Sequence, residues 1–171
     1  MTAQANAHLP SLVGTWRLDP KRTSVSFRTR AAWLIRVTGT LQATKGTADV
    51  DADGRVTGEI VIDPASVDTK NKKRDDHLRS ADFFEVATHP TITFTVTEVR
   101  PSLSGNLELV GSLAVHGRST SLTLLAEIGQ VGDSATLSTE AVITKNILGM
   151  KKANVTKSWV TVHAHFDRVQ P

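Results

Sequence analysis

The segment Ser66–Phe94, SVDTKNKKRDDHLRSADFFEVATHPTITF, interrupts a chain that otherwise alternates apolar and polar residues. Within it, Lys72–Ser80 is charged and contains neither glycine nor proline, which predicts a short helix with Thr69 or Asn71 as its N-cap. Pro90 ends the insertion, because the residue before a proline avoids the helical conformation. We expect this insertion to close, shape or line the place where the protein acts.

On both sides of the insertion, apolar and polar residues alternate with the period of two that marks a strand with one buried face. The run Thr91–Val99 places Ile92, Phe94 and Val96 on one face and threonines on the other. Short turn signals such as Asp51–Gly54 separate the runs. The other predicted strands are Gly14–Leu18, Ser24–Arg30, Val37–Leu41, Val56–Ile62, Asn106–Val115, Ser119–Gln130, Ala135–Lys145 and Ser158–Val169.

These runs amount to about eight strands with mostly short sequential connections and no alternation of strands with helices. They predict an all-β fold, with an antiparallel eight-stranded up-and-down barrel as the leading architecture and a β-sandwich as the alternative. A barrel of eight strands is just wide enough to hold one small ligand. We expect residues 1–13 to form a flexible N-terminal arm and residues 14–171 to form a single barrel domain.

Composition narrows the class of protein. A chain of 171 residues with 39% hydrophobic and 22% charged residues suits one soluble globular domain. The absence of cysteine excludes disulfides, a thiol nucleophile and a thiolate metal site. No apolar run approaches the roughly 18 residues of a membrane span, so we expect no membrane insertion. The N-terminus lacks the basic start and apolar core of a secretory signal, which predicts a cytoplasmic protein.

The sequence contains no motif for binding nucleic acid, a nucleotide cofactor or a metal ion. The net charge of +3 is not concentrated in a tail, and basic residues are not interleaved with stacking aromatic residues, so nucleic acid is not an expected partner. Without a phosphate-binding loop or a dinucleotide fingerprint, no cofactor is expected. His163 and His165 point the same way from a strand, but nothing nearby completes a ligand set, so we expect no metal. His89 and His116 lie in predicted loops and belong to no metal-binding motif.

The densest titratable cluster is Arg74-Asp75-Asp76-His77. In one interpretation, Arg74 and His77 anchor the anionic or polar head of a ligand. In the other, which we favour because charge runs usually have structural or solvated roles, the cluster ties the insertion to the barrel through ion pairs. An enzymatic alternative makes His77 an acid–base group and Arg74 an anion holder for an isoprenoid or fatty substrate.

Several motifs of this chain, taken together, closely resemble the signature of the YceI-like family. The matching motifs are Ser66–Thr69, Arg74–Ser80, Asp82–Phe84 and His89–Phe94, flanked by Trp16–Pro20 and His116-Gly117. The resemblance covers roughly residues 14–168. It implies a lipocalin-like antiparallel barrel, with the short helix inserted between strands, that holds an amphiphilic lipid in an elongated apolar cavity. It implies a carrier or sequestering protein and not an enzyme, and many members of the family are periplasmic.

On this resemblance we expect non-enzymatic binding, storage or transport of a long-chain amphiphile. An isoprenoid quinone, a polyprenyl phosphate and a fatty-acid derivative are the candidate ligands, and a ligand-free stress-response scaffold is the remaining alternative. A homodimer is the protein assembly considered. The side chains expected along the lipid tail are Phe27, Trp33, Leu34, Val37, Phe83, Phe84, Phe94 and Val96, and those expected at the head group are Arg74 and His77.

Overall fold

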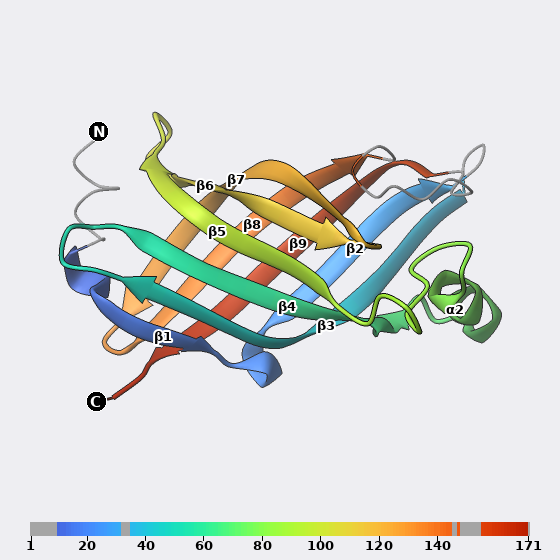
Figure 1. Ribbon diagram of the computed structural model, residues 1–171, viewed down its shortest axis with the longest axis horizontal. Helices are drawn as coiled ribbons and strands as arrows, with labels where there is room; N and C mark the ends of the chain where they lie inside the picture. Colours follow the sequence, from blue (N-terminus) through green and yellow to red (C-terminus); the bar gives the residue numbers. More distant parts are fainter. Residues whose placement is uncertain (1–9, 32–34, 145–146, 148–154, 171) are drawn as a thin grey trace.

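The computed structural model describes residues 10–31, 35–144, 147 and 155–170, and these form an antiparallel β-barrel (Figure 1). Eight strands pair in sequence order, and the last of them pairs with the first to close the ring. The predicted up-and-down barrel is therefore confirmed over the sandwich. The strands of the ring are β2 (Ser24–Ala31), β3 (Ile35–Val50), β4 (Val56–Asp68), β5 (Ile92–Pro101), β6 (Leu107–Val115), β7 (Arg118–Val131), β8 (Ser134–Thr144) and β9 (Val155–Arg168).

A ninth strand, β1 (Gly14–Leu18), occupies the same position in the ring as β2, between β3 and β9. It pairs with the end of β3 and the end of β9, whereas β2 pairs with the opposite halves of the same two strands. The 3₁₀-helix η2 (Pro20–Arg22) separates β1 from β2. The Asp19 side chain caps this helix by accepting the backbone N–H of Lys21 at 2.9 Å. β1 and β2 thus behave as one strand interrupted by a turn.

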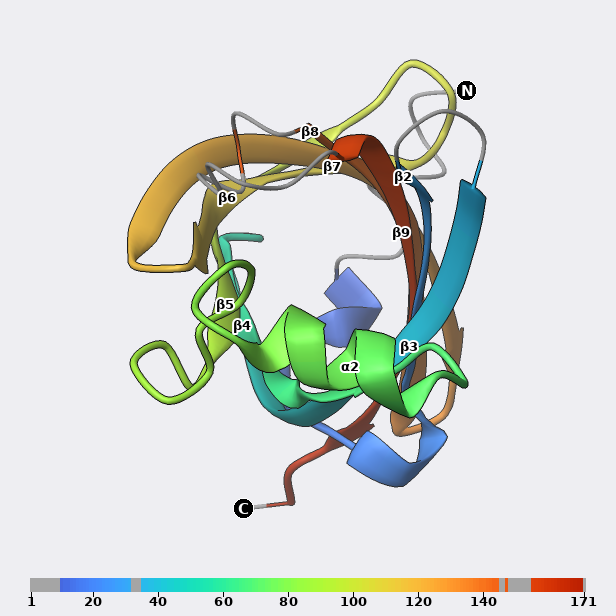
Figure 2. The ribbon, with the colours of Figure 1, turned by 90° about the vertical axis from the view of Figure 1, so that its right-hand side faces the viewer.

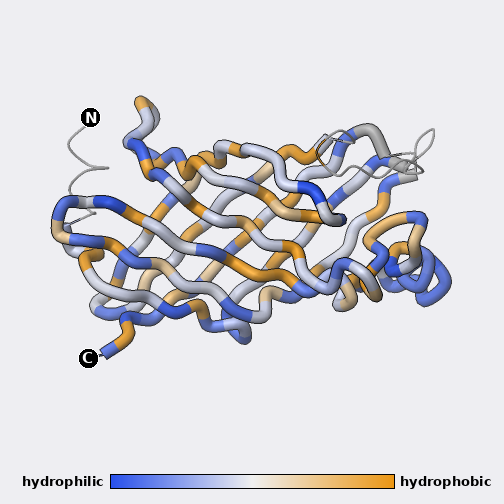
Figure 3. The backbone as a smooth tube through the Cα atoms, in the orientation of Figure 1, coloured by the Kyte–Doolittle hydropathy of each residue, from blue (hydrophilic) through white to orange (hydrophobic). Residues whose placement is uncertain are grey.

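The alternation of the sequence decides which side of each strand faces the interior. On β5, Ile92 and Phe94 are buried. Thr95, which lies between Phe94 and Val96 in the sequence, is exposed. Figure 3 shows the same alternation as short apolar and polar stretches along the strands. A register shift between Val96 and Glu98 absorbs one residue, so that Val99 returns to the interior face.

An apolar plug from the N-terminal part of the chain closes one end of the barrel. Leu12, in the 3₁₀-helix η1 (Pro10–Leu12), packs with Trp16, Val50 and Ala135. The indole N–H of Trp16 donates to the Leu12 carbonyl at 2.7 Å, and the Arg168 guanidinium lies 4.4 Å from the centre of the indole ring. Residues 10–12 of the expected arm are therefore packed on the barrel. Residues 1–9 lie outside the described residues, and a division of the chain at residue 13 stays a prediction.

The helix of the insertion lies at the opposite end of the barrel. Helix α2 (Lys72–Arg79) confirms the predicted helix, and Asn71 is its N-cap because its side chain accepts the backbone N–H of Arg74 at 3.0 Å. In the view along the barrel in Figure 2, α2 crosses only the lower part of the ring of strands. We call this the α2 end. Within the described part of the chain, no helix has the length and apolar character needed to cross a bilayer.

A small ion-pair cluster joins η2 to the end of β9 and gives a pH-dependent stability. Arg22 contacts Asp19 at 2.8 Å and Asp167 at 2.5 Å, and the Ser134 hydroxyl donates to Asp167 at 2.8 Å. The hydrogen bond from Ser134, followed by that from Arg22, lowers the pKa of Asp167. The hydrogen bond from Arg22 likewise lowers the pKa of Asp19.

These lowered pKa values predict the sign of an acid effect. A carboxyl group with a lower pKa in the folded state stabilises the fold above its unfolded-state pKa, and this contribution is lost as the pH falls toward the folded-state pKa. We expect the unfolding free energy of Asp167→Asn to fall less steeply than that of the wild type below about pH 5. Urea unfolding at a series of pH values measures this difference. Parallel curves for the two proteins would contradict it.

Candidate functional site

The interior of the barrel is a cavity of about 750 Å³ that extends from Trp16 at the closed end to Leu78 at the α2 end. Inward-facing residues of every strand of the ring form its wall. Alternation in the sequence predicted inward residues on β2, β3 and β5, and the same pattern in the later strands indicates the rest. Those later residues include Leu109, Leu113, Leu124, Leu137, Val160 and Phe166.

The structure places the described members of the expected ligand site on the wall of this one cavity. Arg74 and His77 line its α2 end. Contact of these side chains with a ligand stays a prediction. Trp33 and Leu34 lie outside the described residues. The expected tail-binding residues that line the cavity are Phe27, Val37, Phe83, Phe84, Phe94 and Val96.

Two glycines let aromatic rings lie along the wall. Gly39 is the cross-strand partner of Phe27, and a β-carbon at Gly39 would lie only 2.5 Å from the Phe27 ring. Gly111 is the cross-strand partner of Val96, and a β-carbon at Gly111 would lie 3.0 Å from the Phe94 ring. An aromatic ring that packs over a bare glycine on a neighbouring strand covers the exposed backbone there. The glycines therefore keep space in the interior that a side chain at either position would remove.

Three hydroxyl groups of the wall have partners within the barrel. The Thr29 and Ser158 hydroxyls lie 2.7 Å apart, and the Thr139 hydroxyl donates to the Leu125 carbonyl at 2.8 Å. Buried polar groups are costly only when they lack hydrogen bonds, so these threonines and serines do not demand a polar ligand. The wall between the two ends is suited to an apolar chain.

At the α2 end, Arg74 is part of a brace that fixes the helix on the end of β4. Asp75 is buried and accepts both the backbone N–H of Thr69, at 2.9 Å, and the Thr69 hydroxyl, at 2.5 Å. Arg74 Nε donates to the same hydroxyl at 2.8 Å, and Nη2 donates to the Thr69 carbonyl at 2.9 Å. Arg79, which the sequence analysis did not single out, donates to the carbonyls of Ala65 and Val67. We expected ion pairs to tie the insertion to the barrel. The contacts of Arg74 and Arg79 are instead hydrogen bonds to Thr69 and to backbone carbonyls.

His77 connects α2 to the segment that follows it. Its Nε2 atom lies 3.1 Å from Asp82 Oδ2. Its ring is nearly perpendicular to that of Phe83, with the ring centres 4.9 Å apart. All three side chains also line the cavity. His77 and Asp82 are thus polar groups beside an aromatic wall, which is the environment that the head of an amphiphile needs.

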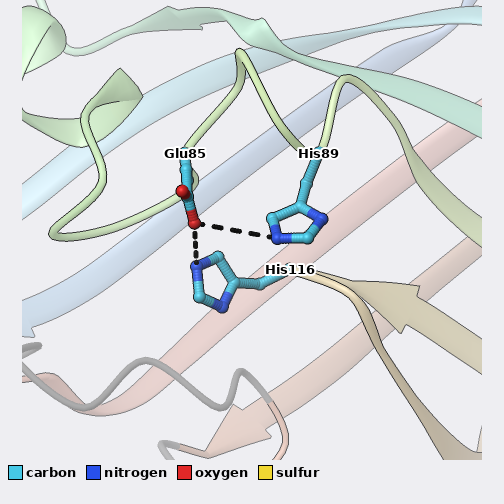
Figure 4. A group of neighbouring side chains, drawn as sticks. All are labelled: Glu85, His89 and His116. Carbon is cyan, nitrogen blue, oxygen red and sulfur yellow. Dashed lines mark ion pairs between the residues drawn. The ribbon is translucent and has the colours of Figure 1, made fainter.

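A second polar cluster lies beside the α2 end and was not expected from the sequence. Glu85 and His89 come from the insertion after α2, and His116 comes from the turn between β6 and β7 (Figure 4). Each offers an atom able to bind a metal ion. No local motif connects these residues, because the fold alone brings the β6–β7 turn to the insertion.

Comparison with known proteins now identifies the fold. Residues 16–167 match the model of the YceI-like domain. The chain belongs to the YceI-like family. A YceI-like relative, protein YceI of Escherichia coli O157:H7, is 34% identical over 111 residues, which cover 64% of this chain and 58% of that protein. The chain spans between 39% and 58% of the length of such relatives.

Two solved structures share the YceI-like barrel. BcnA of Burkholderia cenocepacia has a TM-score of 0.74 at 19% identity, covering 86% of this chain and 98% of that one. A polyisoprenoid binding domain from Saccharophagus degradans has a TM-score of 0.73 at 16% identity, covering 90% of this chain and 98% of that one. At these identities the likeness shows the common fold alone.

Proposed function

We propose that this YceI-like protein binds a long-chain amphiphile in its barrel and stores or transports it without changing it chemically. An isoprenoid quinone, a polyprenyl phosphate and a fatty-acid derivative are the ligand classes that fit. The observation that carries the proposal is the apolar cavity of about 750 Å³ inside a closed barrel. Each buried CH₂ group contributes about 0.8 kcal/mol, so a tail of about ten such groups exceeds the cost of ordering the ligand.

The polarity of the cavity suggests how the ligand is oriented. The tail points toward the plug formed by Leu12 and Trp16, where the lining is apolar. The head lies at the α2 end, where Arg74, His77 and Asp82 line the cavity. In this orientation, burial of the tail provides most of the binding free energy, and the residues at the α2 end select the head group.

Family membership and the state of the polar residues support binding over catalysis. YceI-like barrels include a polyisoprenoid binding domain, which supports a lipid as the ligand here. Arg74 is engaged by Thr69, and His77 contacts Asp82 and Phe83. These contacts support a structural and binding role for the cluster. The enzymatic alternative requires the same two residues to hold and activate a substrate.

A series of saturated fatty acids of increasing length tests the proposal directly. Displacement of a fluorescent fatty-acid probe should show an affinity that rises about fourfold for each added CH₂ group, because 0.8 kcal/mol corresponds to that factor. The rise should stop when the cavity is full. Mass spectrometry of the recovered ligand should find its mass unchanged. An affinity that does not depend on chain length would contradict lipid binding in the barrel, and a changed mass would favour the enzyme.

A further inference from the structure

Three side chains beside the α2 end bring their ligand atoms to one point (Figure 4). Glu85 Oε2 lies 3.7 Å from His89 Nε2 and 3.4 Å from His116 Nε2. One ligand atom from each of the three residues lies within 4.8 Å of the other two. In a tetrahedral zinc site, N and O ligands lie about 2.0–2.2 Å from the metal and hence about 3.4 Å from each other. The two distances to Glu85 Oε2 are therefore close to those between ligands of one bound ion.

Hydrogen bonding does not account for this arrangement. The Nε2 atom of His116 is buried and has no hydrogen-bond partner, although it lies within ion-pair distance of Glu85 Oε2. A buried polar atom left without a partner carries a desolvation penalty. In addition, both imidazoles turn Nε2 toward the same carboxylate oxygen. One cation placed between the three atoms would satisfy all of them together.

Two of the three residues have a positive φ, which is uncommon for residues other than glycine. Glu85 has φ of 49° and His116 has φ of 51°, and among the described non-glycine residues only Lys70 also has a positive φ. The Glu85 carbonyl accepts the backbone N–H of His89 at 2.8 Å, which brings the two side chains to one side of a turn. The His89 ring packs on the bare α-carbon of Gly117, where a β-carbon would lie 2.8 Å from Cε1.

We propose that Glu85, His89 and His116 bind a divalent transition-metal ion of the zinc class, with a fourth position left for water. Imidazole nitrogen together with one carboxylate oxygen suits Zn²⁺ and its neighbours in the series better than Mg²⁺ or Ca²⁺, which prefer oxygen ligands. This assignment revises the expectation of no metal. It goes beyond lipid binding and does not depend on it.

The ion would join two parts of the chain that lie far apart in the sequence. Glu85 and His89 belong to the insertion, and His116 belongs to the β6–β7 turn. Phe84 and Val115, the immediate neighbours of Glu85 and His116, line the cavity. A bound ion would therefore fix the insertion to the rim of the barrel at the α2 end.

Titration of the full-length protein with Zn²⁺ alone tests the site, after treatment with a chelator and dialysis into a buffer that does not bind zinc. Isothermal titration calorimetry should show one equivalent bound per chain, and the thermal midpoint should rise with zinc because the ion binds the folded state. Glu85→Gln, His89→Ala and His116→Asn should each weaken binding at least roughly tenfold. Asparagine is chosen at position 116 because it tolerates a positive φ.

His163→Ala is the matched control, since it removes a histidine from the outer face of β9, where His163 contacts Ser138. It should bind zinc as the wild type does. The proposal is overturned if the wild type binds zinc no more tightly than the double variant His89→Ala/His116→Asn, or if His163→Ala loses as much affinity. Should a variant fail to fold by circular dichroism, anomalous diffraction from zinc-soaked wild-type crystals decides. An ion at Glu85, His89 and His116 supports the site, and an ion bound elsewhere or nowhere overturns it.

Discussion

Ala141→Phe is expected to lower the affinity for a long-chain ligand about thirtyfold. Ala141 lies on β8 and, with its cross-strand partner Val160, lines the cavity. A phenyl ring there would occupy the space of two to three methylene groups of the ligand. At about 0.8 kcal/mol for each, the loss is about 2 kcal/mol, which corresponds to that factor. Displacement of a fluorescent fatty-acid probe measures it.

Val142→Phe is the control, because it makes the same kind of change on the outside of the same strand. Val142 is 42% exposed, and its neighbour Ala141 is buried against the interior. We expect Val142→Phe to bind the probe as the wild type does. Equal losses in the two variants would show that a disturbed strand, and not a blocked interior, causes the effect. Unchanged binding in Ala141→Phe would place the ligand outside the barrel.

Trp16→Ala is expected to cost about 3–5 kcal/mol of unfolding free energy, the usual range for truncation of a large buried aromatic residue. Trp16 is 3% exposed and forms the plug with Leu12, Val50 and Ala135. In a chain of this size the loss corresponds to a fall in thermal midpoint of roughly 10 °C. Circular dichroism during thermal and urea unfolding gives both values.

Trp16→Phe separates the hydrogen bond of the indole from its bulk. It keeps an aromatic ring in the plug but loses the bond from the indole N–H to the Leu12 carbonyl. A buried hydrogen bond contributes about 1 kcal/mol, so this variant should be distinctly more stable than Trp16→Ala. A thermal midpoint of Trp16→Ala equal to that of the wild type would contradict a stabilising role for the plug.

The alternation of residue types was enough to predict the barrel, but not the length of every strand. The pattern predicted an end of β4 at Ile62, because Asp63-Pro64 is a turn signal. The strand continues to Asp68, and its register with β3 jumps from the pair Gln42–Asp63 to the pair Thr40–Asp68. At this bulge the backbone N–H of Gln42 donates to the Ser66 hydroxyl. A proline is tolerated where a bulge already removes the ladder bond.

The site was predictable to the extent that it follows local patterns. Alternation placed Phe94 of β5 on an inward face. For Phe83 and Phe84 of the insertion, the residues alone left open whether they line a cavity or fill the barrel end as core, and only the family resemblance favoured the cavity. The brace of Arg74 on Thr69 was not predicted although the two residues are close in sequence, because the pattern indicated Thr69 only as a possible N-cap. The cluster of Glu85, His89 and His116 depends on the approach of a hairpin turn to an insertion, which only the closed barrel defines.

The most direct test of a lipid-binding barrel is native mass spectrometry of the protein purified from its own host, followed by organic extraction. We expect the wild type to carry one apolar molecule per chain, released on denaturation, and Ala141→Phe to be empty or to carry a shorter one. A wild-type protein that is consistently empty, or an Ala141→Phe protein that carries the same molecule in the same amount, would contradict the proposed function.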